Sequence, residues 1–88
     1  MRRIWIPALP AFLLVSGLAS AGQDMPFDSL PQAVRVTVER ETKGGTITEI
    51  ELETKNGQSY YEVEFLVSGM KYELHVSLDG RLLLRKLD

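Results

Sequence analysis

The sequence predicts an α+β fold in which an N-terminal helix packs on one face of a four-stranded antiparallel meander sheet. Three observations lead to this prediction. Apolar residues recur with helical spacing over residues 30–42. From Thr46 to the C-terminus they alternate with polar residues, as in half-buried strands. Three short turn signals divide this second region into four runs, and the single helix is the element available to cover their apolar face.

Residues 1–21 have the layout of a secretory signal peptide. Two arginines precede an apolar stretch from Ile4 to Leu18, and Ala19-Ser20-Ala21 has the small-x-small pattern of a cleavage site. The alternative is a transmembrane anchor, but the stretch is shorter than the ~20 residues that span a bilayer, and it contains two prolines. We therefore expect cleavage before Gly22, a periplasmic or secreted location, and no stable membrane anchor afterwards.

The chain that remains, residues 22–88, is expected to be a single domain. It has no cysteine, which excludes disulfides, thiolate metal sites and cysteine nucleophiles. Removing residues 1–21 leaves eight basic and twelve acidic side chains, a net charge of −4, which gives no reason to expect a nucleic-acid partner. Residues 22–27 should form a loose lead. A domain this short has a marginal core, so close packing or a partner must stabilise it.

The helix is predicted over residues 30–42. Ser29 and Gln32 have the spacing of a capping box, and Gly44-Gly45 is typical of a helix end. One helical face collects Leu30, Ala33, Val34, Thr37, Val38 and Glu41. The alternative is a strand, because three valines also alternate here and β-branched residues favour strands. The cap and the glycine pair favour the helix.

The four strands are separated by turns predicted at Asn56-Gly57, Gly69-Met70 and Asp79-Gly80. With these turns, Leu52 lies opposite Tyr61, Ile50 opposite Val63 and Thr48 opposite Phe65 in the first hairpin. In the second hairpin, Val67 lies opposite Tyr72, Phe65 opposite Leu74 and Val63 opposite Val76. Both registers keep the apolar residues on one side of the sheet, as a correct register should.

The other side of the predicted sheet is acidic. It carries Glu49, Glu51, Glu53, Glu62, Glu64 and Glu73. The register places Glu51 opposite Glu62 and Glu49 opposite Glu64, and like charges directly opposite one another destabilise a sheet. One interpretation is a solubilising face whose long side chains spread apart. The other is a binding face, with Glu51, Glu62 and Glu64 neutralised by a basic partner or by cations.

His75 is the only histidine, and the register places it opposite Glu64 on the acidic side. A row of Glu49, Glu64 and His75 has the mixed oxygen and nitrogen donors of a divalent-cation site. We favour a solvated strand residue beside acidic neighbours, and we assign no metal and no cofactor. Catalytic motifs and a phosphate-binding glycine loop are not recognisable, so we do not expect an enzyme.

The last strand, from Arg81 to Leu87, is predicted at an edge of the sheet. Leu83 and Leu87 should point inward, while Leu82 and Leu84 point outward. Exposed leucines on an edge strand invite pairing with another chain. The alternative is that strand twist or the N-terminal lead covers them. Leu82 and Leu84 are therefore candidate partner-binding residues.

The order of these elements and several short motifs resemble the PepSY-like domain family. The motifs are Leu30-Pro31, Ile47-Thr48-Glu49-Ile50-Glu51, Tyr60-Tyr61-Glu62-Val63, Tyr72-Glu73-Leu74-His75-Val76 and Leu78-Asp79-Gly80-Arg81-Leu82-Leu83. The resemblance covers about residues 28–88. It implies a small exported bacterial protein, since the family occurs in exported and membrane-associated proteins and in propeptides of thermolysin-type metalloproteases. There it is thought to inhibit or chaperone peptidases, and it has no catalytic motif to transfer.

The sequence and the resemblance together lead us to expect a non-catalytic binding module whose partner is a peptidase or another envelope protein. The first alternative is a structural or sensory envelope protein that binds cations on its acidic sheet face. A small hydrolase is the remaining alternative. The identity of the partner and the oligomeric state do not follow from the sequence.

Overall fold

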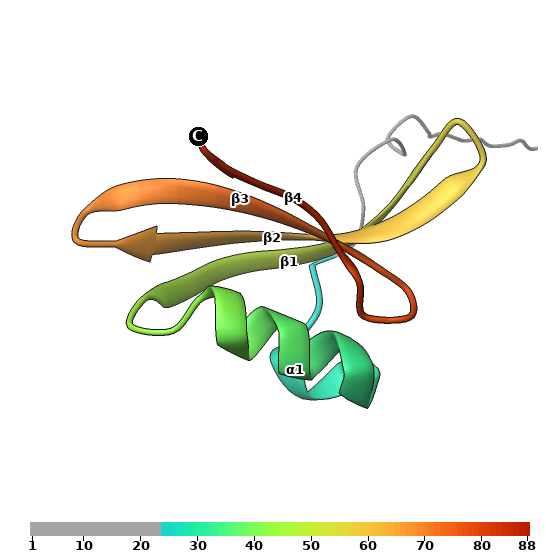
Figure 1. Ribbon diagram of the computed structural model, residues 1–88, viewed down its shortest axis with the longest axis horizontal. Helices are drawn as coiled ribbons and strands as arrows, with labels where there is room; N and C mark the ends of the chain where they lie inside the picture. The colour runs from blue at the N-terminus through green and yellow to red at the C-terminus, as the bar shows by residue number, and fades with distance from the viewer. Residues whose placement is uncertain (1–23) are drawn as a thin grey trace, which may run out of the picture.

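The computed structural model describes residues 24–88, which form one helix and a four-stranded antiparallel sheet (Figure 1). The predicted signal peptide, residues 1–21, and the predicted new N-terminus at Gly22 lie outside the described residues. The elements are η2 (Phe27–Ser29), α1 (Gln32–Glu41), β1 (Thr46–Lys55), β2 (Gln58–Val67), β3 (Met70–Ser77) and β4 (Leu82–Leu87). The strands neighbour one another in chain order, β1-β2-β3-β4. The predicted α+β class and the antiparallel meander are therefore confirmed.

Helix α1 begins later than predicted, and without the predicted capping box. Ser29 lies in η2, where its hydroxyl donates a hydrogen bond to the Pro26 carbonyl (2.8 Å) instead of capping α1. Pro31 precedes the helix, and its carbonyl accepts from the backbone N–H groups of Val34 (3.0 Å) and Arg35 (2.9 Å). Proline suits this place because the first helical N–H groups have no partner within the helix. In the described part of the chain, no helix is long and apolar enough to cross a membrane.

One buried cluster joins the helix to the sheet. It consists of Leu30, Val34, Val38, Ile50, Val63, Phe65, Leu74 and Val76. Phe65 is the largest fully buried side chain, and its ring stacks on Tyr72 with the ring centres 5.4 Å apart. Helix α1 lies along one side of the sheet, below it in the view of Figure 1. Burial of apolar surface in this cluster is the main stabilising contribution in so small a domain.

The β3–β4 turn packs tightly against α1 at Gly80. A methyl group on Gly80 would lie 2.6 Å from the carbonyl oxygen of Ala33, and Gly80 has a φ of +92°. The buried hydroxyl of Thr37 donates a hydrogen bond to the Gly80 carbonyl. Both the close approach and the positive φ require glycine here.

The first hairpin has the predicted turn, and its register is correct except at one end. Asn56 and Gly57 both have positive φ, as a type I′ turn requires. Leu52 pairs with Tyr61 and Ile50 with Val63, but a bulge follows, and Ile47 rather than Thr48 lies opposite Phe65. The bulged Thr48 donates its hydroxyl to the Glu64 carbonyl (3.2 Å). A bulge inserts one residue and cannot be detected from alternation alone.

The predicted register of the second hairpin is wrong by two residues. The turn is Ser68-Gly69, with φ of 52° and 77°, so Val67 pairs with Met70. Consequently Phe65 lies opposite Tyr72, and Val63 lies opposite Leu74 instead of Val76. A type I′ turn needs positive φ at both central residues, and the predicted Gly69-Met70 turn would have forced Met70 into that region. A shift of two residues leaves every side chain on its predicted face.

Candidate functional site

The candidate site is the acidic side of the sheet together with its β4 edge. All six predicted glutamates are partly buried on this side, and Glu51–Glu62 and Glu49–Glu64 are the pairs that face each other across β1 and β2, as predicted. The predicted row of Glu49, Glu64 and His75 does not form. Because the second hairpin is shifted, Glu64 faces Glu73, and His75 faces Glu62.

Two rows therefore cross the sheet with different chemistry. The first row runs Glu51, Glu62, His75 and Leu84 from β1 to β4. The second row runs Glu49, Glu64, Glu73 and Lys86. Both rows are acidic at the β1 side. At β4 the first row ends in the apolar Leu84, and the second ends in the basic Lys86.

His75 is held in place by two neighbours. Its ring stacks on Tyr60 with the ring centres 4.5 Å apart, and its Nε2 lies 2.5 Å from Oε2 of Glu73. The potential ligand atoms of Glu62, Glu73 and His75 all lie within 4.8 Å of one another. A second set with this spacing consists of Glu51, Glu53 and Glu62, so Glu62 belongs to both. This donor set suits a divalent cation that accepts oxygen and nitrogen ligands.

Crowding of the carboxylates changes their protonation. Burial, and then a hydrogen bond with Glu73, raises the pKa of Glu62 to about 7. Hydrogen bonds with Glu49 and Glu53 raise the pKa of Glu51 to about 8. Burial opposes the change at Glu73, but the hydrogen bond with His75 prevails and lowers the pKa of Glu73. Some of these carboxyl groups therefore hold protons near neutral pH, unlike ordinary glutamates.

Basic side chains on β3 and β4 relieve the repulsion at one end of the face. Lys71 binds Glu64 with an N–O distance of 3.2 Å, and this contact raises the pKa of Lys71. Lys86 lies opposite Glu73. The repulsion is thus concentrated toward β1, around Glu51 and Glu62.

The edge strand β4 departs most from its prediction. Leu83 and Leu87 were expected to point inward. Leu87 does lie on the core side, opposite Tyr72, but it is 53% exposed, and Leu83 is 48% exposed. Among the strands, β3 makes the main contact with the helix, and every residue of β4 remains exposed. Leu83 is the extra residue of a bulge between the pairs Val76–Leu82 and His75–Leu84.

This bulge also separates the two candidate leucines. Residues directly opposite each other share a face of a sheet. Leu84 therefore lies on the acidic side with His75, as predicted, whereas Leu82 lies opposite the core residue Val76. Both leucines are 37% exposed, so neither is fully covered. The predicted partner-binding residues thus come together along one edge but not on one face.

Arg85 has a role in the site that the sequence did not predict. Its guanidinium carbon lies 5.0 Å from the centre of the Tyr72 ring and 5.6 Å from that of Phe65. Its Nε also lies 3.4 Å from a carboxylate oxygen of Glu41 at the end of α1. Arg85 thus fastens the edge strand to the helix through charge and ring stacking. The only signal in the sequence is alternation along the last strand, which puts Arg85 in phase with Leu83 and Leu87.

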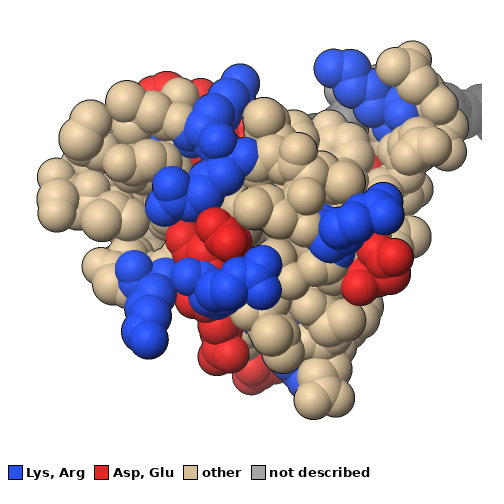
Figure 2. All heavy atoms as spheres, in the orientation of Figure 1, with Lys and Arg blue, Asp and Glu red and all other residues tan. Residues whose placement is uncertain are grey.

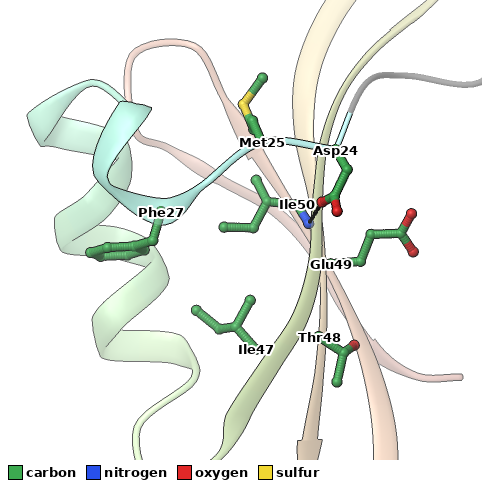
Figure 3. Close-up of a pocket in the computed structure, with 7 residues that line it drawn as sticks. All are labelled: Asp24, Met25, Phe27, Ile47, Thr48, Glu49 and Ile50. Carbon is green, nitrogen blue, oxygen red and sulfur yellow. Dashed lines mark hydrogen bonds between the residues drawn. The ribbon is translucent and has the colours of Figure 1, made fainter.

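The N-terminal lead is also more ordered than predicted. The backbone N–H of Met25 donates to the Ile50 carbonyl (2.9 Å), and the Ile50 N–H donates to the Asp24 carboxylate (3.3 Å). The lead thereby occupies part of the β1 edge. Beside it lies a hollow of about 300 Å³, lined by Asp24, Met25, Phe27, Ile47, Thr48, Glu49 and Ile50 (Figure 3). In that view the apolar side chains lie between α1 and β1, and the polar ones point to the other side.

Comparisons with the models of known protein families, with characterised proteins and with solved structures found no match for this chain.

Proposed function

We propose that this protein is an exported, non-catalytic binding module of the PepSY-like type, whose partner is a peptidase or another envelope protein. The proposal includes a periplasmic or secreted location and an N-terminal helix that covers one face of the sheet, as the sequence pattern predicts. The family motifs fall on separate elements: the Tyr-Tyr-Glu-Val motif on β2, the Tyr-Glu-Leu-His-Val motif on β3, and the last two residues of the final motif on β4.

The observation that carries the proposal is the exposed β4 edge. Every residue of β4 is exposed, and four of its six residues are leucines. Soluble proteins usually blunt or cover an apolar edge strand, because it can pair with another chain. Leu82 and Leu84 are the residues that we assign to the contact, with Glu51, Glu62 and Glu64 on the acidic side as its continuation.

The test is partner capture by two matched variants. The exported protein would be used to capture partners from envelope extract and to inhibit a thermolysin-type metallopeptidase. Leu84→Lys should weaken both activities, because it places a charge on the binding edge. Val36→Lys is the control, since Val36 is 53% exposed on the helix, away from the sheet edge. If neither capture nor inhibition is specific in the unaltered protein, or if both variants behave alike, the proposed function is wrong.

Export is tested separately by intact-mass spectrometry of the protein recovered outside the cytoplasm. A mass that begins at Gly22 supports cleavage after Ala21. A product that retains residues 1–21 would contradict it.

Cation binding on the acidic face is the alternative function, and the two closely spaced ligand sets favour it. In this case Ca²⁺ or Zn²⁺ should raise the melting temperature in the absence of any partner. Glu62→Gln should remove most of the increase, because Glu62 belongs to both sets. Glu39→Gln, on the exposed side of α1, is the matched control. A melting temperature that neither cation changes would eliminate this alternative.

A further inference from the structure

The backbone of β4 has unused hydrogen-bonding groups that face away from the sheet. Ser77 donates its N–H to the Arg81 carbonyl, and Asp88 donates its N–H to the Lys71 carbonyl, so these residues point their backbone groups across the β3–β4 boundary. In an antiparallel ladder, such residues alternate with residues that point the other way. Lys86 therefore bonds to β3, whereas Arg85 and Leu87 direct N–H and C=O outward. Among the described residues, no strand pairs with this edge.

The side chains along the regular part of the edge, residues 84–87, form a short pattern. Leucines stand at both ends, and Arg85 and Lys86 stand between them. Figure 2 shows Lys and Arg side chains gathered on the face where β4 runs in Figure 1, with acidic side chains between them. Arg85 already binds Glu41 on one side, but its side chain is 41% exposed, and a guanidinium can bind a second carboxylate.

A second copy of this chain fits the edge poorly. A two-fold dimer that extends the sheet through β4 must pair the strands antiparallel and use the outward groups of Arg85 and Leu87. Pairing Arg85 with the same residue of the copy opposes two guanidinium groups. Pairing Arg85 with Leu87 of the copy places the two Lys86 side chains opposite each other. Pairing Leu87 with Leu87 of the copy leaves only one hydrogen-bonded pair of residues between the two strands.

We propose that β4 binds an extended segment of a partner protein by antiparallel strand addition, and that this segment has the pattern apolar–acidic–acidic–apolar. The two acidic residues would face Lys86 and Arg85, and the apolar residues would face Leu87 and Leu84. Main-chain hydrogen bonds supply affinity in this mode of recognition, and side chains supply selectivity. The inference rests on the proposed function and specifies the chemistry of the partner at the same edge.

The direct test uses synthetic peptides. A fluorescent, end-capped peptide with the core Leu-Glu-Glu-Leu is titrated with the exported protein, and anisotropy reports binding. The matched peptide with Leu-Lys-Lys-Leu should bind about tenfold more weakly or worse, which corresponds to about 1.4 kcal/mol. Two further peptides are N-methylated at alternate residues, one at odd and one at even positions. Methylation of the N–H groups that face β4 should abolish binding, and methylation of those that face away should leave it unchanged. Equal binding of the acidic and basic peptides, or equal effects of the two methylation phases, would overturn strand addition.

Substitutions in the protein separate strand addition from simple charge attraction. Leu87→Pro removes an N–H that faces the open edge and breaks no bond to β3, so the urea midpoint should hold while peptide affinity falls about tenfold. Leu52→Pro is the matched control on the opposite edge, because Ile50, two residues before it, directs its own N–H outward to the lead. Lys86→Glu should also weaken binding of the acidic peptide, whereas Lys55→Glu, at the β1–β2 turn, should not.

The same variants distinguish this inference from the proposed function. If the unaltered protein captures a specific partner and Leu87→Pro captures it equally well, the binding module stands and strand addition at β4 is wrong. If sedimentation shows a dimer that Leu87→Pro abolishes, the occupant is a second copy, and the acidic segment is wrong.

Discussion

The two sides of the sheet are built from the same strands, yet opposite forces act on them. The side that faces α1 contributes five apolar residues to the buried cluster, and the four of them on β2 and β3 have no exposed surface. The other side holds six partly buried glutamates, with two pairs directly opposed. The first side stabilises the fold by burial, and the second tolerates repulsion that burial must offset. A small domain keeps such a costly face more readily if the face has a use.

The largest effect should come from breaking the apolar side at its centre. Phe65→Ala removes a fully buried ring that stacks on Tyr72 and lies under Arg85. We expect a loss of about 3–5 kcal/mol in the free energy of unfolding, the usual range for truncating a buried phenylalanine. The midpoint of urea unfolding measures it, with Val36→Ala on the exposed side of α1 as the control. A loss similar to that of the control would mean that the core lies elsewhere.

A smaller loss should follow from Gly80→Ala, which tests the contact between the β3–β4 turn and α1. The added methyl would lie 2.6 Å from the Ala33 carbonyl oxygen, at a position with a φ of +92°. We expect destabilisation of about 2 kcal/mol. Gly57→Ala is the control, because it has a similarly positive φ but nothing within 4 Å of the new methyl. Equal losses in both variants would show that backbone strain, and not the close contact, accounts for the effect.

The acidic side should make the free energy of unfolding fall as the pH rises, which is the opposite of acid denaturation. The pKa of Glu62 is raised to about 7 and that of Glu51 to about 8, so the folded chain binds more protons than the unfolded chain above pH 4.5. Their stabilising contribution is complete below pH 4.5 and is lost as the pH rises through 7 and 8. Glu73, whose pKa is lowered, has the opposite effect, but only below pH 4.5.

We therefore expect the free energy of unfolding to fall between pH 5 and pH 9. The fall should be about 1 kcal/mol, because solvent screens these partly exposed groups. Glu62→Gln should flatten the profile and be neutral or slightly stabilising at pH 8, since it removes a like-charge pair. Urea unfolding at several pH values measures both effects. Unfolding of the domain by Glu62→Gln would show that this side chain is part of the core.

The smallest effect on stability should come from the edge. Leu84→Lys changes an exposed residue on the acidic side, so its effect on the free energy of unfolding should stay within about 0.5 kcal/mol. The substitution should nevertheless weaken partner binding. A large loss of stability would indicate that the leucine is covered in the folded chain, and the edge would no longer be a candidate contact.

Much of the fold could be predicted because its signals lie between neighbours in the chain. The alternation of apolar and polar residues located all four strands, and the Asn56-Gly57 pair identified the first turn. The second turn was misplaced by one residue, since Gly69 is compatible with either turn position and only the positive φ of Ser68 decides between them. As a result His75 was predicted opposite Glu64, whereas it lies opposite Glu62. The residues that come together in the candidate site therefore differ from those predicted.

Alternation and turn chemistry thus determine which residues lie on each face, because a side chain's face depends only on its own strand and survives a two-residue shift. The tertiary structure decides which residues become neighbours across strands. It brings Glu62, Glu73 and His75 together, it fastens Arg85 to Glu41, and it leaves β4 beyond the helix. Bulges at Thr48 and Leu83 contribute to this outcome. They arise where twist and packing of the whole sheet require an extra residue, and no local pattern in the sequence encodes that requirement.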